Sequence, residues 1–176
     1  ALGEGDRIVG ISAYTMRPPE AKIDKPIVSA FINGSVPKIA ALKPDLIIGF
    51  SDIQAELARS LIAANMPVLI FNQRSIQEIL EVIIAVGQLV GRAERAQDLV
   101  AGYITRLEQC QVRAACRERS RVYFEEWDDP MITGIQWVGE LIELAGGVDI
   151  FQDRSKGKLA KERFVSMDEV IDGAPE

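Results

Sequence analysis

The chain has 176 residues, of which 48% are hydrophobic and 26% charged, and its formal net charge is −6. This composition is typical of a globular protein with room for one large domain or two small lobes, and its acidic balance argues against nucleic acid as the main partner. No apolar run reaches the roughly 18 residues that a membrane-spanning helix needs, so we expect no transmembrane segment.

The first 72 residues alternate predicted strands and helices. The expected elements are strands at 7–12, 46–50 and 67–71, helices at 36–42 and 53–64, and a loop at 13–25 centred on two prolines. The run at 46–50 is apolar throughout, as in a parallel strand that is buried on both faces. This alternation predicts a parallel α/β fold.

A long helical region follows. Ser75 and Glu78 form the S-x-x-E pattern of a capping box, apolar residues then recur at helical spacing, and Gly91 can end that helix. A second helix is expected over about 93–119. Its two cysteines, Cys110 and Cys116, point to different sides of a helix, so we expect no disulfide between them.

The last part of the chain returns to mixed structure. The expected elements are a strand at 121–127, a helix at 134–145, a basic flexible loop at 154–163 and a final segment at 166–176. Trp137 has helical spacing with two leucines, which favours a place in the core.

One pattern occurs twice, as a serine, an aliphatic residue and a proline followed by an acid. The first copy begins at Ser35 and ends at Pro44-Asp45, and the second begins at Ser166 and ends at Pro175-Glu176. Each describes a capped helix that proline stops so that a strand can begin. Because a strand follows the first copy, we expect one after the second, and we interpret the chain as truncated.

Several blocks together resemble a known family. They are "RIVGIS", "PPEA", "KIAALKPDLIIG", "FEEWDDP", "GELIELAGGVDIF" and "VSMDEVI". In their order along the chain they are similar to the substrate-binding proteins of ABC importers for cobalamin, ferric siderophores and haem, with the cobalamin branch nearest. The resemblance implies two α/β lobes with parallel sheets, joined by a rigid backbone helix, and a chain truncated at both ends. It divides the sequence into an N-terminal lobe at 1–74, a helical linker at 75–119 and an incomplete C-terminal lobe at 120–176.

The resemblance also implies an aromatic-lined cleft between the lobes, and aromatic faces suit a large, flat, partly apolar ligand. The positions that match ligand-contacting residues are Tyr14, Phe31, Phe50, Trp127 and Met131. The residues themselves leave alternatives open. Phe50 could belong to the core instead. The acidic run at 125–129 could be a solvated strand end, a hydrogen-bonding rim for corrin amides or a calcium site. The basic loop at 154–163 could attract anionic groups of a ligand.

Docking onto the permease of the importer is implied by the same resemblance. In the family, each serine pattern carries a glutamate that contacts permease arginines. Here those positions hold Pro37 and Asp168, so Asp168 keeps a carboxylate and Glu56 is a possible substitute for the first. We expect a periplasmic or membrane-anchored extracytoplasmic protein, and we expect no signal segment in "ALGEGDRIVG", which lacks a basic n-region and an apolar h-region.

The absence of histidine bears on the choice of function. It removes Ser/His and Cys/His pairs, so we expect no catalytic residues. The resemblance implies a binding function for a small-molecule metal chelate, with no cofactor and no resident metal. The alternative is a metal-chelatase-like or nucleotide-dependent enzyme on a similar framework. It is less favoured because "GEGDRIVG" precedes its strand and matches no phosphate-binding loop. A zinc or manganese carrier would rely on histidines.

Overall fold

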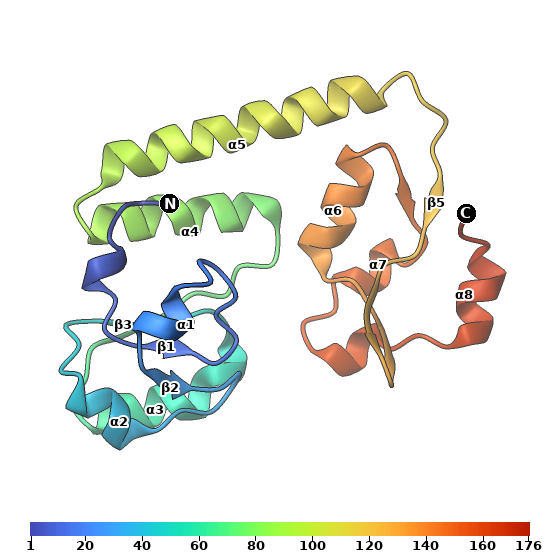
Figure 1. The fold of residues 1–176 in the computed structure, drawn as a ribbon. Helices are drawn as coiled ribbons and strands as arrows, with labels where there is room; N and C mark the ends of the chain where they lie inside the picture. The colour runs from blue at the N-terminus through green and yellow to red at the C-terminus, as the bar shows by residue number, and fades with distance from the viewer. The chain divides into compact units, whose positions relative to one another are not determined.

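The computed structural model describes residues 1–176, and the chain divides into two compact units, Ala1–Gln73 and Arg74–Glu176 (Figure 1). The three-part division of the sequence given above stays a prediction. No helix in either unit combines the length and apolar character needed to cross a membrane.

The first unit alternates short strands and helices. Its elements are η1 (Gly5–Arg7), β1 (Ile11–Ser12), α1 (Ala21–Asp24), β2 (Ile27–Ser29), α2 (Val36–Ala41), β3 (Ile47–Gly49), η2 (Asp52–Gln54), α3 (Ala55–Ala63) and β4 (Val68–Ile70). Strand β1 pairs with β2 and β3 pairs with β4, both in parallel. These parallel pairs confirm the predicted α/β class.

Three expectations for this unit need correction. The predicted strand at 7–12 is shorter, because residues 5–7 form a 3-10 turn and only Ile11–Ser12 pair. The predicted loop at 13–25 contains α1, and β2 was not predicted. Strand β3 is not buried on both faces. Ile48 is 46% exposed while its two neighbours in the strand are half-buried, as expected when alternate side chains point to opposite faces.

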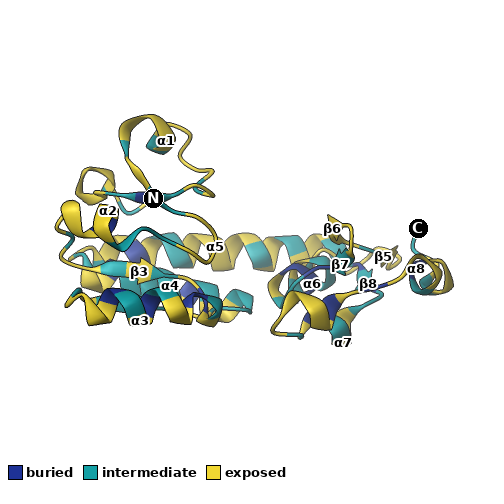
Figure 2. Ribbon diagram, turned by 90° about the horizontal axis from the view of Figure 1, so that it is seen from below, coloured by how far each residue is buried: buried dark blue, intermediate teal, exposed yellow.

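Helix α2 begins as the first serine pattern predicts. The Ser35 hydroxyl accepts a hydrogen bond from the Lys38 amide at 3.4 Å, which satisfies one of the free N–H groups of the first turn. Its Ile39 is buried, as are Ala58 and Leu61 of α3 (Figure 2). These side chains belong to the apolar core of the first unit.

Helices α4 (Ile76–Leu89) and α5 (Ala93–Ala114) open the second unit. The capping box predicted at Ser75 and Glu78 is present in both directions. The two helices approach closely at Gly87, where a Cβ would lie 2.3 Å from the Cβ of Ala96, a fully buried residue. Glycine is therefore required there by space.

Short elements follow the helix pair. They are β5 (Arg121–Val122), β6 (Glu125–Asp128), β7 (Met131–Thr133), α6 (Gln136–Leu144), β8 (Val148–Asp149), α7 (Gln152–Ser155), η3 (Ala160–Arg163) and α8 (Met167–Gly173). Strands β5 and β8 pair in parallel, and β6 and β7 form an antiparallel hairpin. Ser166 caps α8 in a full capping box with Glu169, which confirms the helix of the second serine pattern.

Three expectations for this unit were also wrong. The predicted strand at 121–127 is two strands, since the chain leaves β5 after Val122 and β6 pairs with β7 instead. The predicted flexible loop at 154–163 contains the end of α7 and all of η3. Trp137 is 37% exposed rather than a core residue, because it lies in the first turn of α6, where only part of the ring is covered. Cys110 and Cys116 are both free thiols.

Candidate functional site

Three aromatic residues follow the carboxyl ends of successive strands in the first unit. Tyr14 follows β1, Phe31 follows β2 and Phe50 follows β3. The rings of Tyr14 and Phe31 meet edge to face with centroids 5.7 Å apart, and those of Phe31 and Phe50 are 5.4 Å apart and tilted by 42°. We call these three residues the aromatic cluster. The carboxyl ends of parallel strands are where ligands commonly bind in α/β folds.

The aromatic cluster is exposed although its rings contact one another. Tyr14 is 66%, Phe31 49% and Phe50 40% exposed. Phe50 is therefore not a core residue, which was the alternative that its sequence left open. Contiguous exposed aromatic rings are unusual on a protein surface and indicate a binding surface.

Polar side chains beneath the cluster hold its backbone in place. The Ser12 hydroxyl donates to the Ala30 carbonyl at 3.1 Å and accepts from the Tyr14 amide at 3.2 Å. The Gln54 side chain accepts from the Phe50 amide at 2.9 Å and donates to the Phe31 carbonyl at 3.2 Å. Neither residue was predicted. A signal existed for Gln54, since Ser51-x-x-Gln54 matches the S-x-x-[EQ] pattern.

A groove of about 420 Å³ lies next to the cluster in the same unit. It is lined by β2, the following turn and the start of α2, including Ser35 and Lys38. Ala13 and Ala30 line it, and they are the chain neighbours of Tyr14 and Phe31. None of the predicted ligand-contacting residues themselves line this groove.

The other two predicted ligand-contacting residues lie in the β6–β7 hairpin of the second unit. Trp127 is 60% exposed, and its indole N–H donates to the Asp129 carbonyl at 3.0 Å. The register pairs Trp127 with Ile132 and Asp128 with Met131. Since paired residues share a face and neighbours alternate, Trp127 and Met131 lie on opposite faces of the hairpin.

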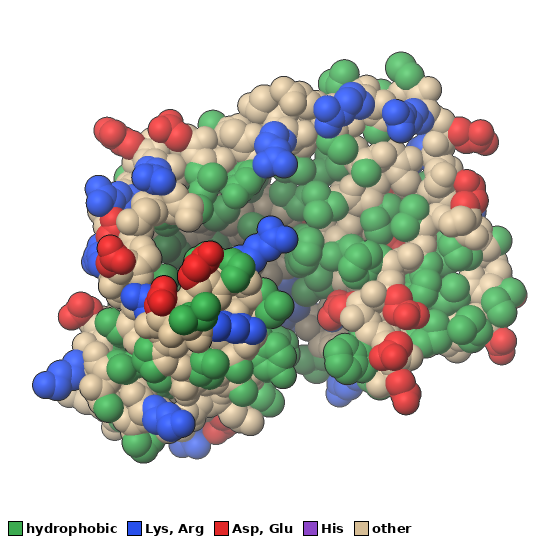
Figure 3. All heavy atoms as spheres, viewed as in Figure 1, with side chains coloured by type: hydrophobic (Ala, Val, Ile, Leu, Met, Phe, Trp, Pro, Cys, Tyr) green, Lys and Arg blue, Asp and Glu red, His purple; other side chains and the backbone are tan.

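Acidic residues flank Trp127 in the sequence. Glu125, Asp128 and Asp129 are exposed, and Figure 3 shows acidic side chains gathered over this hairpin. The Tyr123 hydroxyl donates to Glu125 at 3.2 Å, and burial, followed by this bond to a carboxylate, raises the pKa of Tyr123 to about 12. No three His, Cys, Asp or Glu side chains form a group that could hold a metal ion.

Arg163 contacts both strands of the β6–β7 hairpin. Its side chain is 6% exposed, forms an ion pair with Glu126 through both terminal nitrogens and donates to the Thr133 carbonyl at 2.6 Å. Arg154 likewise pairs with Glu169 at 2.5 Å. The idea that the basic loop attracts anions therefore fails for these two arginines, because carboxylates of the same unit already neutralise them.

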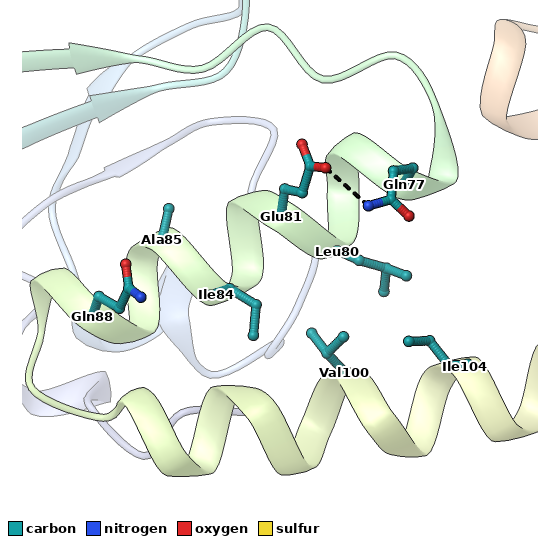
Figure 4. A pocket seen from close by; sticks show the side chains of 8 residues that line it. All are labelled: Gln77, Leu80, Glu81, Ile84, Ala85, Gln88, Val100 and Ile104. Carbon is teal, nitrogen blue, oxygen red and sulfur yellow. Dashed lines mark hydrogen bonds between the residues drawn. The ribbon is translucent and has the colours of Figure 1, made fainter.

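A second groove, of about 300 Å³, runs between α4 and α5 (Figure 4). Leu80, Ile84, Val100 and Ile104 make it largely apolar, and Gln77 donates to Glu81 at 2.9 Å along its edge. It contains none of the predicted site residues. We assign it no function.

The proposed docking residues lie on the surface of their own units. Asp168 is exposed in the first turn of α8. Glu56 is exposed in the first turn of α3 and forms an ion pair with Arg59 at 2.9 Å. Pro37 lies in the first turn of α2, where proline is well tolerated.

The chain matches a known protein family over nearly its whole length. The model of the family described as "Periplasmic binding protein" matches residues 1–171. The chain belongs to this family. A curated relative, the vitamin B12-binding protein of Vibrio cholerae (strain O395), is 30% identical over an aligned length of 158 residues, and the match covers 87% of this chain and 56% of the relative. The chain thus spans little more than half the length of the curated relatives it matches.

Solved structures agree with this assignment. The periplasmic vitamin B12-binding protein BtuF of Vibrio cholerae superposes with a TM-score of 0.78 at 28% identity, over 99% of this chain and 68% of that one. The periplasmic heme-binding protein RhuT from Roseiflexus sp. RS-1 gives a TM-score of 0.81 at 23% identity, over the same shares, which shows a common fold. The two-lobed α/β fold predicted from the sequence is confirmed.

Proposed function

We propose that this chain is part of a solute-binding protein that captures a metal chelate and delivers it to an ABC importer. The observation that carries the proposal is the aromatic cluster. Three exposed rings contact one another at the carboxyl ends of parallel strands. Such a surface matches the faces of a corrin, a porphyrin or a siderophore with aromatic groups.

Among metal chelates we propose a corrinoid first. The relative at 30% identity is named a vitamin B12-binding protein, and B12 carries amide groups around its ring. The exposed carboxylates of the β6–β7 hairpin accept hydrogen bonds from amides and repel the carboxylates of haem. We propose Trp127 as the ligand-contacting residue of this hairpin; a contact by Met131, which lies on the opposite face, stays a prediction from the resemblance. Haem and ferric siderophores are the alternative ligands within the proposed class of metal chelates.

The proposed role is binding and delivery, not catalysis. The relative and the two solved structures described above are all named as binding proteins, which supports this role over the enzymatic alternative. The chelate is cargo, so no cofactor is proposed. The proposed partner is the importer permease, contacted through Asp168 and Glu56, and the proposed location is periplasmic or membrane-anchored outside the cytoplasm.

A titration tests the proposal. Purified protein is mixed with cyanocobalamin, hemin and a ferric siderophore, and tryptophan fluorescence and ligand absorbance are recorded. Saturable binding of at least one of these ligands is expected. No change with any of them would contradict the proposed function.

A further inference from the structure

The Gln54 side chain joins two loops that carry rings of the aromatic cluster. It is 8% exposed, and both ends of its amide are used. The carbonyl oxygen accepts from the Phe50 amide at 2.9 Å and the NH₂ group donates to the Phe31 carbonyl at 3.2 Å. One side chain therefore fixes the backbone of Phe31 relative to that of Phe50.

This bridge is not an ordinary helix cap. In a capping box the third helical residue accepts from the amide of the capping serine. Here the Ser51 hydroxyl accepts from the Ile53 amide at 3.4 Å, while Gln54 reaches past Ser51 to the amide of Phe50. Its second bond runs to a different strand end altogether. Both of its partners are the backbones of residues in the aromatic cluster.

The Gln54 amide is closely packed on the side that faces Gly49. A Cβ at Gly49 would lie 2.7 Å from the Gln54 side-chain oxygen and 2.4 Å from Cδ1 of Ile70. Gly49 therefore leaves room for the amide where β3 ends. Because the Gln54 side chain is buried and packed on this side, the amide has little freedom to leave its two partners.

We infer that Gln54 is a positioning residue, which holds the rings of Phe31 and Phe50 in the spacing that a flat ligand contacts. This inference rests on the proposed function. Rings that are ordered before binding lose less conformational freedom when the ligand arrives, and this raises affinity. Without the two hydrogen bonds of Gln54, the loops that carry Phe31 and Phe50 move independently of each other.

The test uses Gln54→Met, which keeps the approximate shape and removes both hydrogen bonds, with Gln77→Met on the exposed face of α4 as the matched control. Affinity for cyanocobalamin and hemin is measured well below the unfolding midpoint of each variant. For whichever of the two ligands the parent chain binds, we expect Gln54→Met to lower the affinity about tenfold and Gln77→Met to leave the affinity unchanged. Equal affinity of Gln54→Met and the parent chain would overturn the inference alone.

A double-mutant cycle separates positioning from general destabilisation. If Gln54 acts through the ring of Phe31, then Gln54→Met causes little further loss of affinity in a Phe31→Ala background, although it lowers the unfolding stability by the same amount in both backgrounds. Losses of affinity that simply add would overturn the inference.

A ligand-free measurement keeps the two proposals distinguishable. With fluorinated phenylalanine, the ¹⁹F resonances of Phe31 and Phe50 should shift or broaden in Gln54→Met and stay in place in Gln77→Met. Unchanged resonances would overturn the positioning role. If the parent chain binds none of the probes while these resonances do respond, the proposed function fails and the structural bridge stands without a ligand.

Discussion

The guanidinium of Arg163 and the carboxylate of Glu126 form an ion pair that joins η3 to strand β6. Arg163 is nearly buried, whereas 40% of the Glu126 side chain is exposed. The pair also places Arg163 against the Thr133 carbonyl of the neighbouring strand. The ion pair therefore fixes the hairpin that carries Trp127. If the pair is broken, water can solvate the Glu126 carboxylate but not the nearly buried Arg163 guanidinium.

The buried guanidinium predicts that the effects of removing Glu126 and Arg163 are not additive. Glu126→Gln leaves a buried cation without its counter-charge and should lower the free energy of unfolding by about 2 kcal/mol, less than for a fully buried pair. Adding Arg163→Met should cost little more, because the unpaired charge is then gone. Urea denaturation of both variants measures this. Lys156→Met, which breaks an exposed pair with Asp153, is the control and should change stability by less than about 0.5 kcal/mol. Fully additive losses for Glu126 and Arg163 would contradict this account.

Glu169 predicts a pH dependence for helix α8. The Arg154 guanidinium, together with the Ser166 amide and hydroxyl, lowers the pKa of Glu169 from 4.5 to about 2. A carboxyl whose pKa falls on folding stabilises the protein above its unfolded pKa, and this contribution disappears as pH falls through the folded pKa. Glu169→Gln should therefore be less stable than the parent chain at pH 7, and the difference should shrink between pH 4.5 and 2. Denaturation at several pH values measures this. A difference independent of pH would contradict the assignment.

The docking proposal predicts loss of transport without loss of binding. Asp168→Asn and Glu56→Gln should each reduce importer-dependent uptake in vesicles that contain the permease, while ligand affinity stays unchanged, because neither residue belongs to the proposed ligand-contacting set. Pro37→Glu should increase uptake by restoring a carboxylate near the start of α2. Glu81→Gln, on an exposed position of α4, is a charge-matched control. Unchanged uptake in all variants would contradict docking through these residues.

The acidic hairpin predicts discrimination between ligands. Replacing Glu125, Asp128 and Asp129 by their amides should raise hemin affinity several-fold, because three negative charges that repel its carboxylates are removed. Affinity for cyanocobalamin should change much less, because its amide groups are uncharged and the oxygens of the substituted side chains still accept hydrogen bonds from them. The gain for hemin should diminish in high salt, where exposed charges are screened. A similar change for both ligands would contradict an electrostatic origin.

Local sequence signals predicted the parts of the fold that depend on nearby residues. Ser35, Ser75 and Ser166 cap the helices expected of them, since capping bonds join residues a few positions apart. The parallel strand pairs followed from the alternation of helices and apolar runs. The confirmed two-lobed fold, however, came from a resemblance and not from these patterns alone.

Longer-range contacts were beyond local patterns. The hairpin at Trp127 was read as the end of one long strand, because an extended run looks alike whichever strand it pairs with. Arg163 was assigned to a mobile basic loop, because its partner Glu126 is 37 positions away in the sequence and no local pattern predicts the pair. Of the aromatic cluster, the resemblance gave the three rings, but the bridge through Gln54 appears only in three dimensions.

The most direct test of the central claim is a fluorescence and absorbance titration with cyanocobalamin, comparing the parent chain with Phe31→Ala, Phe50→Ala and Trp127→Ala. The account predicts saturable binding by the parent chain, and an affinity at least about tenfold lower for each phenylalanine variant, whose lost ring provides stacking area. It also predicts that Trp127→Ala remains folded, since that side chain is largely exposed, and loses most of the fluorescence response. Binding of equal affinity by the parent chain and both phenylalanine variants would contradict a ligand site at the aromatic cluster.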